Sequence, residues 1–534
     1  MKKITLCIAL LVGFVSHAQW NIDTAVNTLI ADSNSGDMKS IGTSDGQTYI
    51  VFWKVVAAPT NYELRLQLLD ATGTKQFGND GMLVSNTIPM STFTSVWSLS
   101  IDSSDNLYIG CSGTDDDSGH AFKMNTSGTQ LWAITFPSAL VVNILPLSSG
   151  DNIVSWLSTS AFKATMQKYD SNGNDIWPAT QAALSGSSST SPGDLYEIST
   201  GNYIMVFHVI GSGINSTLYA QRFDTDGNAV WTNPTQLSNK TTAFNTTYDG
   251  LVDNDIVYYG YIGKSATRFD SYLQRINSDG TLPWGINGMD FDTNETNYEQ
   301  ATKIAYSSGS NYIWAVCSYT NTSQSESGEY VQKFDKTSGA RQFTDTAKEI
   351  YVIGSENVHA GNLQLVNDQP LFLIKSGNDN GATPTTLNAC YLDSNGDFVW
   401  PEEIKPMATF SGNKGRIQFV KPVNGQAVTV FIEDKGAGNK IYAQNFTDTA
   451  LSIDEFNSEI SLQYLNPIKN ELKLKSNELI KVVSVYNILG QSIITLDTNS
   501  NEVVIDSQSW TSGMYFIKIS TINGNEKGIN ILKE

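Results

Sequence analysis

Alternating polar and apolar positions predict short β-strands along most of the chain. The side chains of Tyr330, Gln332 and Phe334 fall on one face of a strand, and residues 219–223 repeat this pattern. Each such stretch is preceded by short apolar runs with the length and composition of further strands, such as GNYIMVFHV (201–209) and SNYIWAVCSY (310–319). The pattern therefore predicts an all-β fold.

A turn motif followed by an aromatic residue recurs seven times along the chain. Its glycines are spaced by 45 to 59 residues, and an Asp or Asn stands three positions before most of them, as Asp170 does before Gly173. In the sixth copy Asp335 stands four positions before Gly339. The glycines are Gly73, Gly128, Gly173, Gly227, Gly280, Gly339 and Gly396, and the aromatic residues four positions later are Phe77, Trp132, Trp177, Trp231, Trp284, Phe343 and Trp400.

Each copy of this motif is typical of a hairpin. An Asp or Asn that caps its own turn, followed by a glycine that accepts positive φ, joins two strands at low steric cost. Together with the apolar runs upstream, each repeat supplies four short strands in roughly 54 residues. Four short strands in a repeat of this length predict a propeller blade.

The two ends of the repeat region predict how the blades close. In the last repeat, residues 413–448, Gln444 and Phe446 stand where other repeats have Gln and an aromatic residue before the turn. The glycine turn and the outer strand that should follow are missing. Trp20 lies 57 residues before Phe77, in a setting similar to that of Trp177. We therefore expect residues 19–450 to form an eight-bladed β-propeller whose last blade is completed by an N-terminal strand, which removes an open sheet edge.

The unit D-x-x-G-x-x-x-W resembles the tryptophan-docking repeat of pyrroloquinoline-quinone-type eight-bladed propellers. The resemblance implies that the aromatic residue packs between neighbouring blades. The expected blade-docking residues are Trp20, Phe77, Trp132, Trp177, Trp231, Trp284, Phe343 and Trp400. The resemblance covers only the turn and the outer strand. The family's vicinal disulfide, calcium ligands and catalytic carboxylate have no counterpart in the sequence, so neither quinone chemistry nor a cofactor is expected.

Short alternating strands such as ELKLKS (471–476) and MYFIKIS (514–520) predict a small β-sandwich over residues 451–534. Motifs in this segment resemble the type A C-terminal sorting domain of the type IX secretion system of Bacteroidetes, although Leu465 replaces the proline that usually precedes the Asn-Pro pair. The motif residues are Asn466, Pro467, Gly490, Gly513 and Tyr515. The resemblance implies engagement with the type IX machinery, passage through the outer membrane, removal of the tail, and release or fixation of the cargo. An immunoglobulin-like accessory module is the alternative.

Residues 1–18 have the order of a secretory signal peptide, with Lys2 and Lys3, an apolar run from Ile4 to Val15, and a small-residue boundary at Ala18. A membrane anchor is the alternative, but about 12 apolar residues are fewer than the roughly 20 needed to span a bilayer. No other run is long enough for a transmembrane segment. We therefore expect a secreted protein, extracellular or at the outer-membrane surface.

The formal net charge of −20 disfavours nucleic acid or anionic lipid as a partner, because such binding depends on Lys and Arg neutralising phosphates. Cys111, Cys317 and Cys390 lie inside strand-like runs and are expected to be buried free thiols. His120, His208 and His359 are scattered without metal-ligand spacing, so we expect structural roles for them and no metal site.

Motifs for catalysis are absent from the sequence. Neither a nucleophile elbow, a phosphate loop, a dinucleotide fingerprint nor a zinc-protease helix is present. A sialidase box has a different spacing, and arginine is scarce. Acidic loops such as DSNGND (170–175) are similar to the start of a calcium loop, but the Glu that completes such a site is missing, so calcium is the alternative to turn capping.

The leading hypothesis is an exported cell-surface or extracellular binding or adhesion protein with a non-catalytic propeller, whose ligand is a glycan or a protein. The alternative is a secreted polysaccharide-active enzyme with carboxylates in the propeller channel. Paired acids about 5 to 10 Å apart at the channel mouth would favour the enzyme, whereas aromatic rings and amides would favour binding. A third hypothesis is a structural surface-layer component that associates with itself.

Overall fold

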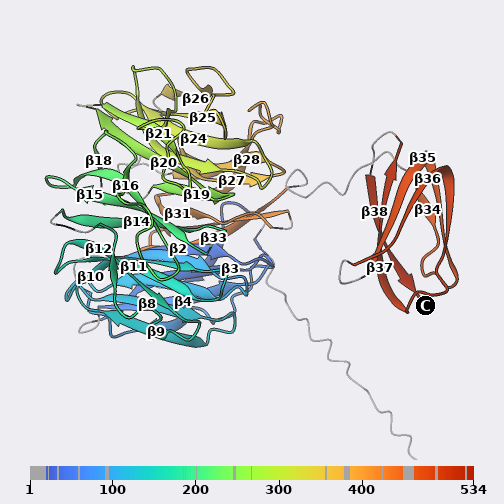
Figure 1. The fold of residues 1–534 in the computed structure, drawn as a ribbon, viewed down its shortest axis with the longest axis horizontal. Coiled ribbons are helices and arrows are strands. Elements are labelled where there is room, and N and C mark those ends of the chain that lie inside the picture. The colour runs from blue at the N-terminus through green and yellow to red at the C-terminus, as the bar shows by residue number, and fades with distance from the viewer. Residues whose placement is uncertain are drawn as a thin grey trace, which may run out of the picture. The chain divides into compact units, whose positions relative to one another are not determined.

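The computed structural model describes residues 20–21, 23–32, 35–57, 61–90, 95–184, 186, 188–199, 201–243, 248–265, 268–354, 358–377, 385–423, 425–448, 462–487, 491–522 and 526–534. The chain divides into two compact units, Met1–Thr447 and Asp448–Glu534 (Figure 1). Every regular element of the described residues is a strand. In this part of the chain, no helix has the length and hydropathy needed to cross a bilayer. The expected signal peptide, residues 1–18, lies outside the described residues.

The strands of the larger unit form four-stranded antiparallel sheets in which consecutive strands are neighbours. The first sheets are β2–β5 (Ser35–Gly42, Thr48–Val55, Tyr62–Leu69, Met82–Ser85), β6–β9 (Val96–Ile101, Leu107–Ser112, Gly119–Met124, Gln130–Phe136) and β10–β13 (Ala139–Pro146, Asn152–Ser158, Lys163–Tyr169, Gln181–Ala182). The next is β14–β17 (Thr190–Glu197, Tyr203–Ile210, Asn215–Phe223, Thr235–Gln236), where β18 (Thr242–Ala243) also pairs with β16. The following sheets are β19–β22 (Asp249–Asp253, Ile256–Ser265, Arg268–Ile276, Met289–Asp290), β23–β26 (Tyr298–Ala305, Tyr312–Thr320, Ser327–Asp335, Lys348–Gly354) and β27–β30 (Val358–Val366, Gln369–Ser376, Thr385–Tyr391, Ile404–Gly412).

One further sheet joins the start of the chain to the end of the larger unit. Its order is β1-β33-β32-β31, with β1 at Thr28–Ala31, β31 at Lys414–Phe419, β32 at Gln426–Asp434 and β33 at Asn439–Thr447. Strand β1 runs antiparallel to β33, and Thr28 stands opposite Ala443. In Figure 1 the blue strands β2 and β3 accordingly lie beside the orange strands β31 and β33.

The first strands of successive sheets contact one another. Strand β2 contacts β6, and the same contact continues through β10, β14, β19, β23, β27 and β31, which in turn contacts β2. Polar side chains reinforce these contacts, because Ser98 Oγ donates to the Val142 carbonyl over 3.0 Å and Gln364 Nε2 donates to the Phe419 carbonyl over 3.1 Å. The prediction of an all-β fold built from blade-like sheets is therefore confirmed.

The glycine turns show why the repeat keeps its Asp and Gly. At the turn after β12, Asp170 Oδ1 accepts the backbone N–H groups of Asn172 and Asn174, at 2.8 and 2.9 Å. Gly173 has a φ of +84°, in the left-handed region that a side chain disfavours, and its N–H donates to the Asp170 carbonyl over 3.0 Å. The carboxylate thus accepts hydrogen bonds from turn N–H groups that have no partner on a neighbouring strand.

The aromatic residue of one repeat lies against the turn glycine of the next. Trp177 Nε1 donates to the Thr225 carbonyl over 3.0 Å, and a Cβ placed on Gly227 would lie 3.0 Å from Trp177 Cε2. The other neighbouring pairs are Trp20 with Gly73, Phe77 with Gly128, Trp132 with Gly173, Trp231 with Gly280, Trp284 with Gly339, and Phe343 with Gly396. Trp400 has no glycine turn after it and instead meets the ring of Phe446, with centroids 5.4 Å apart.

In most sheets a buried glutamine on the third strand fastens the segment that carries the aromatic residue; β8 and β29 have no glutamine. Gln167 Nε2 donates to the Trp177 carbonyl over 2.9 Å, and Gln221 Nε2 donates to the Trp231 carbonyl over 3.1 Å. Gln444 on β33 makes the equivalent bond to Asn21, next to Trp20, over 2.7 Å. The N-terminal segment is therefore held in the same way as the outer segments of the other sheets.

A fully buried ion pair lies in the same sheet as β1. Lys414 Nζ is 2.7 Å from Glu433 Oε1, and both side chains have no exposed surface. Lys414 also donates to the Thr385 carbonyl over 2.7 Å, and Asn27 Nδ2 donates to Glu433 Oε2 over 3.4 Å. Burial lowers the pKa of Lys414, and the bond to Glu433 opposes that shift. The pair thus ties β31 and β32 to the residues that precede β1.

The smaller unit is one sheet in the described residues, ordered β34-β35-β37-β38 with β36 paired to β35. Its strands are β34 (Leu462–Tyr464), β35 (Glu471–Asn487), β36 (Ser492–Asp506), β37 (Gly513–Thr521) and β38 (Glu526–Lys533). Register shifts between Lys475 and Val482 divide the long strand β35. Leu474 before the shifts and Val483 after them belong to one buried core with Ile517.

We predict that Gly227→Ala destabilises the larger unit by about 1–2 kcal/mol more than Gly150→Ala. Both glycines have positive φ, at +84° and +89°, so the backbone penalty is shared. The new methyl group meets Trp177 and Gln181 at position 227 but nothing within 4 Å at position 150. Urea unfolding followed by tryptophan fluorescence measures the difference, and equal losses would show that the indole contact contributes nothing.

We predict that Glu433→Ala lowers the free energy of unfolding by about 3–5 kcal/mol, because it leaves the Lys414 ammonium buried and unpaired. The control Asp397→Ala removes an exposed partner of Lys348 and should cost less than about 1 kcal/mol. The double variant Lys414→Met/Glu433→Leu should regain most of the loss, since it removes both charges. Equal effects of the two single variants would contradict this account.

Candidate functional site

A cavity of about 460 Å³ lies among the first strands of several sheets. Its walls come from β2, β6, β10, β14 and β31, from the second strands β11, β15 and β20, and from Tyr248 just before β19. The polar and aromatic lining residues are Lys39, Ser40, Trp97, Ser98, Asn143, Asp194, His208, Tyr248, Tyr259 and Gln418. The volume is within the range of about 300–1,000 Å³ that is usual for ligand pockets.

β-bulges shape this wall. Pairing between first and second strands shifts register between Leu140 and Asn143 in β10, between Pro192 and Leu195 in β14, and between Gly415 and Gln418 in β31. The extra residues include Val141 and Arg416, which have positive φ. A bulge turns the side chains next to it away from the regular alternation. The cavity therefore receives Asn143, Asp194 and Gln418 from bulged segments of three different sheets.

Asp194 is the only carboxylate among the described residues that line this cavity. Burial raises its pKa from 3.8 to about 6, a hydrogen bond from Tyr259 opposes the shift, and the nearby charge of Asp249 adds to it. Tyr196 also bonds to this carboxyl group, and burial raises the pKa of that phenol well above 10. Asp194 therefore exists in both protonation states near neutral pH, and offers a donor as well as an acceptor.

Aromatic rings form the other part of the wall. Trp97 Nε1 donates to Ser112 Oγ over 2.8 Å, which fixes the indole on β6. The ring of Tyr248 is stacked on His208, with centroids 5.9 Å apart. Burial lowers the pKa of His208 to about 4, so its imidazole is neutral at pH 7. Rings, amides and hydroxyls in this arrangement can bind the apolar faces and polar groups of an uncharged ligand.

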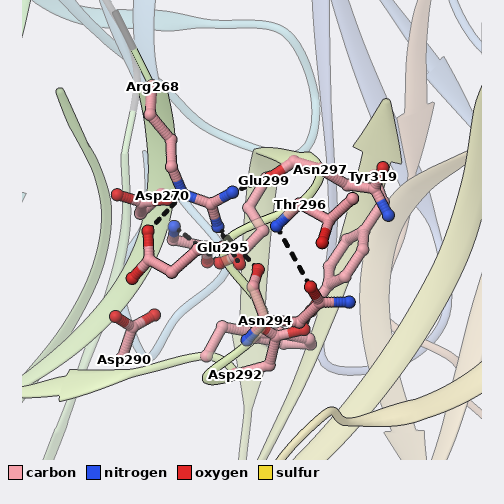
Figure 2. Close-up of polar contacts among 12 residues, drawn as sticks. Arg268, Asp270, Asp290, Asp292, Asn294, Glu295, Thr296, Asn297, Glu299 and Tyr319 are labelled. Carbon is pink, nitrogen blue, oxygen red and sulfur yellow. Dashed lines mark hydrogen bonds and ion pairs between the residues drawn. The ribbon is translucent and has the colours of Figure 1, made fainter. Parts of the chain in front are cut away.

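A second cluster of polar residues surrounds Arg268 on β21 (Figure 2). Its Nη2 donates to Glu299 Oε1 over 3.3 Å and to the Asn294 carbonyl over 2.9 Å, while Nε faces Glu295 Oε2 at 3.0 Å and Asp270. Burial, together with the charge of Asp292, raises the pKa of Glu299 above its usual range.

The guanidinium occupies the middle of this cluster, where the carboxylates converge (Figure 2). Asp290, Asp292 and Asn294 follow one another at every second position, and Asn294 N donates to Asp292 Oδ1 over 2.7 Å. Among the residues that the structure describes, no group of three or more His, Cys, Asp or Glu side chains is placed to hold a metal ion. Arg268 supplies positive charge to this loop through its ion pairs with Asp270, Glu295 and Glu299. The spacing D-x-D-x-N of Asp290, Asp292 and Asn294 is the sequence pattern that marks this acidic loop, and the sequence analysis did not single it out.

The residues singled out in the sequence do not meet at either place. The repeat aromatics other than Trp400 lie at the glycine turns, Trp400 lies against Phe446, and none of them lines the 460 Å³ cavity. Cys111, Cys317 and Cys390 are buried free thiols, as predicted. His120 Nε2 lies 2.8 Å from Ser118 Oγ, and only His208 reaches the cavity, while the side chain of His359 lies outside the described residues.

The sorting-motif residues lie in the smaller unit. Asn466 Nδ2 donates to the Asn530 carbonyl over 3.1 Å, and its Oδ1 accepts the Leu532 N–H over 2.8 Å, so this side chain fastens the segment to β38. Pro467 follows it, and Gly513 begins β37. Tyr515 donates to the Thr511 carbonyl over 3.0 Å and packs on Trp510. Gly490 lies outside the described residues.

We predict that Arg268→Ala destabilises the larger unit by about 3–5 kcal/mol, because it leaves several carboxyl groups without their counter-ion. The matched control Arg416→Ala removes a guanidinium that is 62% exposed and pairs with Asp37 at 3.2 Å, so its loss should stay within about 1 kcal/mol. Thermal unfolding followed by circular dichroism measures both. A loss of the same size in both variants would show that Arg268 is not the internal cation of this loop.

Comparisons with solved structures return distant likenesses to the fold. The Dos1 propeller is 8% identical with a TM-score of 0.42, over 78% of this chain and 94% of that chain. Drosophila Semaphorin 2a is 8% identical with a TM-score of 0.37, over 84% and 98%. Puromycin hydrolase is 9% identical with a TM-score of 0.37, and the match spans 61% of its length. These identities and TM-scores are too low to transfer any activity. A comparison with curated protein sequences gives no match.

The smaller unit has a defined relative. Residues 463–532 match the family described as the secretion system C-terminal sorting domain. This match covers β35–β37 and most of β38, and it includes the motif residues from Asn466 to Tyr515. The chain therefore carries a type IX sorting tail, which implies export and a location in the medium or at the cell surface.

Proposed function

We propose that the larger unit is a closed eight-bladed propeller and that the protein is an exported binding or adhesion protein with a non-catalytic site in the propeller channel. The pairing of β1 with β33 and the contact of β31 with β2 support closure. The sorting tail supports export by the type IX machinery. In this proposal residues 1–18 are a signal peptide, 19–450 the propeller and 451–534 the sorting domain.

The repeat aromatics serve in this proposal as blade-docking residues that hold neighbouring sheets at a fixed spacing. Indole N–H bonds support this role, since Trp20, Trp231 and Trp284 donate to the carbonyl two positions before the next repeat's glycine, over 3.0 to 3.3 Å. A regular spacing of sheets is what keeps the first strands around one axis. The similarity to pyrroloquinoline-quinone-type repeats extends to this packing and to no cofactor.

One observation carries the binding function. The cavity among the first strands is lined by aromatic rings, amides and hydroxyls, and the charged groups among its described lining residues are Lys39 and one carboxylate, Asp194. Hydrolysis of a glycosidic bond ordinarily requires two carboxyl groups at the reacting bond. This lining instead offers rings for apolar faces, and side chains that both donate and accept hydrogen bonds. A neutral glycan is the ligand class that uses both.

A second candidate function rests on Asp194. Its pKa of about 6 is that of a general acid able to donate a proton near neutral pH, and Asp249 lies close enough to raise it further. Asp249 itself accepts the Ile304 N–H over 2.8 Å, and burial raises its pKa. The two acids would then form the carboxylate pair of a secreted polysaccharide-active enzyme.

We predict that the full-length protein binds neutral oligosaccharides on a glycan array without hydrolysing them. Trp97→Ala should weaken binding at least about tenfold, because the indole forms one wall of the cavity. The control Phe162→Ala removes a ring that is 58% exposed and outside the cavity, and should change nothing. Hydrolysis that Asp194→Asn abolishes, with binding retained, would replace this proposal with the enzyme. An array without signal would contradict both.

We predict that Asp194→Asn gains stability relative to the native protein as the pH rises from about 4 to 8, by up to about 3 kcal/mol. The folded state holds the Asp194 proton more tightly than the unfolded state. The resulting stabilisation is complete below pH 3.8 and is lost as the pH rises through about 6. Chemical unfolding of both proteins across this pH range measures the effect, and a difference that does not vary with pH would contradict the raised pKa.

A further inference from the structure

A second cavity of about 240 Å³ adjoins the first. It is lined by residues near the start of β16, in β18, near the end of β20, near the starts of β21 and β23, and in the β24–β25 loop. Tyr248 lines both cavities. We propose that the two cavities form one elongated site for a neutral oligosaccharide, with Tyr248 as the ridge between its subsites. This inference rests on the proposed binding function and specifies its ligand as an extended chain.

Both cavities reach the same end of the first strands. In the first cavity, Leu140 and Pro192 lie in the first halves of β10 and β14, and His208 lies near the end of β15. In the second, Gln300 lies near the start of β23, and Lys264 lies near the end of β20. Because first and second strands are antiparallel, the starts of the first strands lie beside the ends of the second strands. One ligand can therefore reach both cavities from one face.

The ridge between the cavities is held in place. Tyr248 is 8% exposed, and its hydroxyl accepts the Ala243 N–H over 3.2 Å and donates to the Ile262 carbonyl over 3.3 Å. A series of hydrogen bonds also connects the two cavities. His208 Nδ1, in the first cavity, lies 3.0 Å from Ser216 Oγ, which lies 2.9 Å from Thr242 Oγ1 in the second. A ligand that crosses the ridge therefore meets a fixed ring and not a mobile side chain.

The chemistry of the second cavity continues that of the first. Its described lining residues include no carboxylate, and Lys264 is the only charged residue among them. Gln300 Nε2 donates to Gln324 Oε1 over 3.0 Å, and the Phe269 ring has Lys264 Nζ at 5.3 Å from its centroid. Amides can donate and accept at once, as the hydroxyl groups of a sugar require. The elongated site holds two lysines, Lys39 and Lys264, beside the Asp194 carboxyl group, which is too little positive charge for a phosphate polymer.

The volumes explain why the ligand is an oligomer. The smaller cavity is below the range of about 300–1,000 Å³ that is usual for an independent ligand pocket, whereas the larger one is within it. The smaller cavity is therefore an extension subsite, and it gains a ligand only when the first cavity holds the neighbouring part of the same chain. A peptide is the competing extended ligand, and its binding is one outcome of the experiment below.

The experiment compares neutral disaccharides with the matching hexasaccharides of the cello-, xylo-, manno- and laminari- series, by calorimetry on the full-length protein. We expect at least one hexasaccharide to bind about tenfold more tightly than its disaccharide. Phe269→Ala should remove this gain and leave the disaccharide affinity unchanged. Phe162→Ala is the matched control, because it removes an exposed phenyl ring outside both cavities. Lys264→Ala gives a second test of the same subsite with less effect on packing.

The outcomes separate this inference from the proposed function. If Trp97→Ala weakens the hexasaccharide but Phe269→Ala and Lys264→Ala do not, the elongated site is wrong and the binding function stands. If a hexasaccharide and its disaccharide bind equally, the extension subsite is also wrong. If none of these sugars binds, both proposals fail. Binding of an extended peptide that Phe269→Ala abolishes would overturn the carbohydrate class.

Discussion

A strand at the edge of a sheet exposes backbone N–H and C=O groups that pair readily with any other chain. In the larger unit this constraint is met by the pairing of β1 with β33, which brings residues from opposite ends of the unit into one sheet. Gln444 and Glu433 fasten the residues around β1 with side-chain bonds of their own. The sheets on either side of it depend on this pairing, because the first strand of each sheet contacts the first strands of the sheets before and after it.

The same unit of interaction recurs from sheet to sheet. A turn glycine leaves room for the aromatic ring of the preceding repeat, and in most sheets a buried glutamine holds the segment that carries this ring. These contacts lie at the glycine turns, whereas the cavity lies among the first strands. In the proposed function, the residues that stabilise the sheets are therefore different from those that bind the ligand. The turns and outer segments must keep one sequence pattern, while the bulged first strands are free to differ between sheets.

The parts of the fold that were predictable are those with local signals. Strand alternation and the D-x-x-G turns depend only on residues close together in the chain, so the all-β fold could be predicted from the sequence. The Asn-Pro and Gly-x-Tyr motifs likewise indicated the sorting tail. The cavity could not be predicted in this way. Asn143 and Asp194 reach it because bulges shift their strands, and a bulge follows from pairing with the second strand and has no fixed sequence signature. Arg268 likewise comes from a different strand than the acidic loop that it neutralises.

The pairing of β1 with β33 also sets a time order for folding. Thr28 meets Ala443 only after almost the whole larger unit has been delivered, and contacts of such long sequence separation form late. In a chain delivered from its N-terminus, β1 therefore stays without its partner until the last strands of the larger unit are available. The sheet that contains both ends of the unit is thus the one that cannot form from any partial length of it.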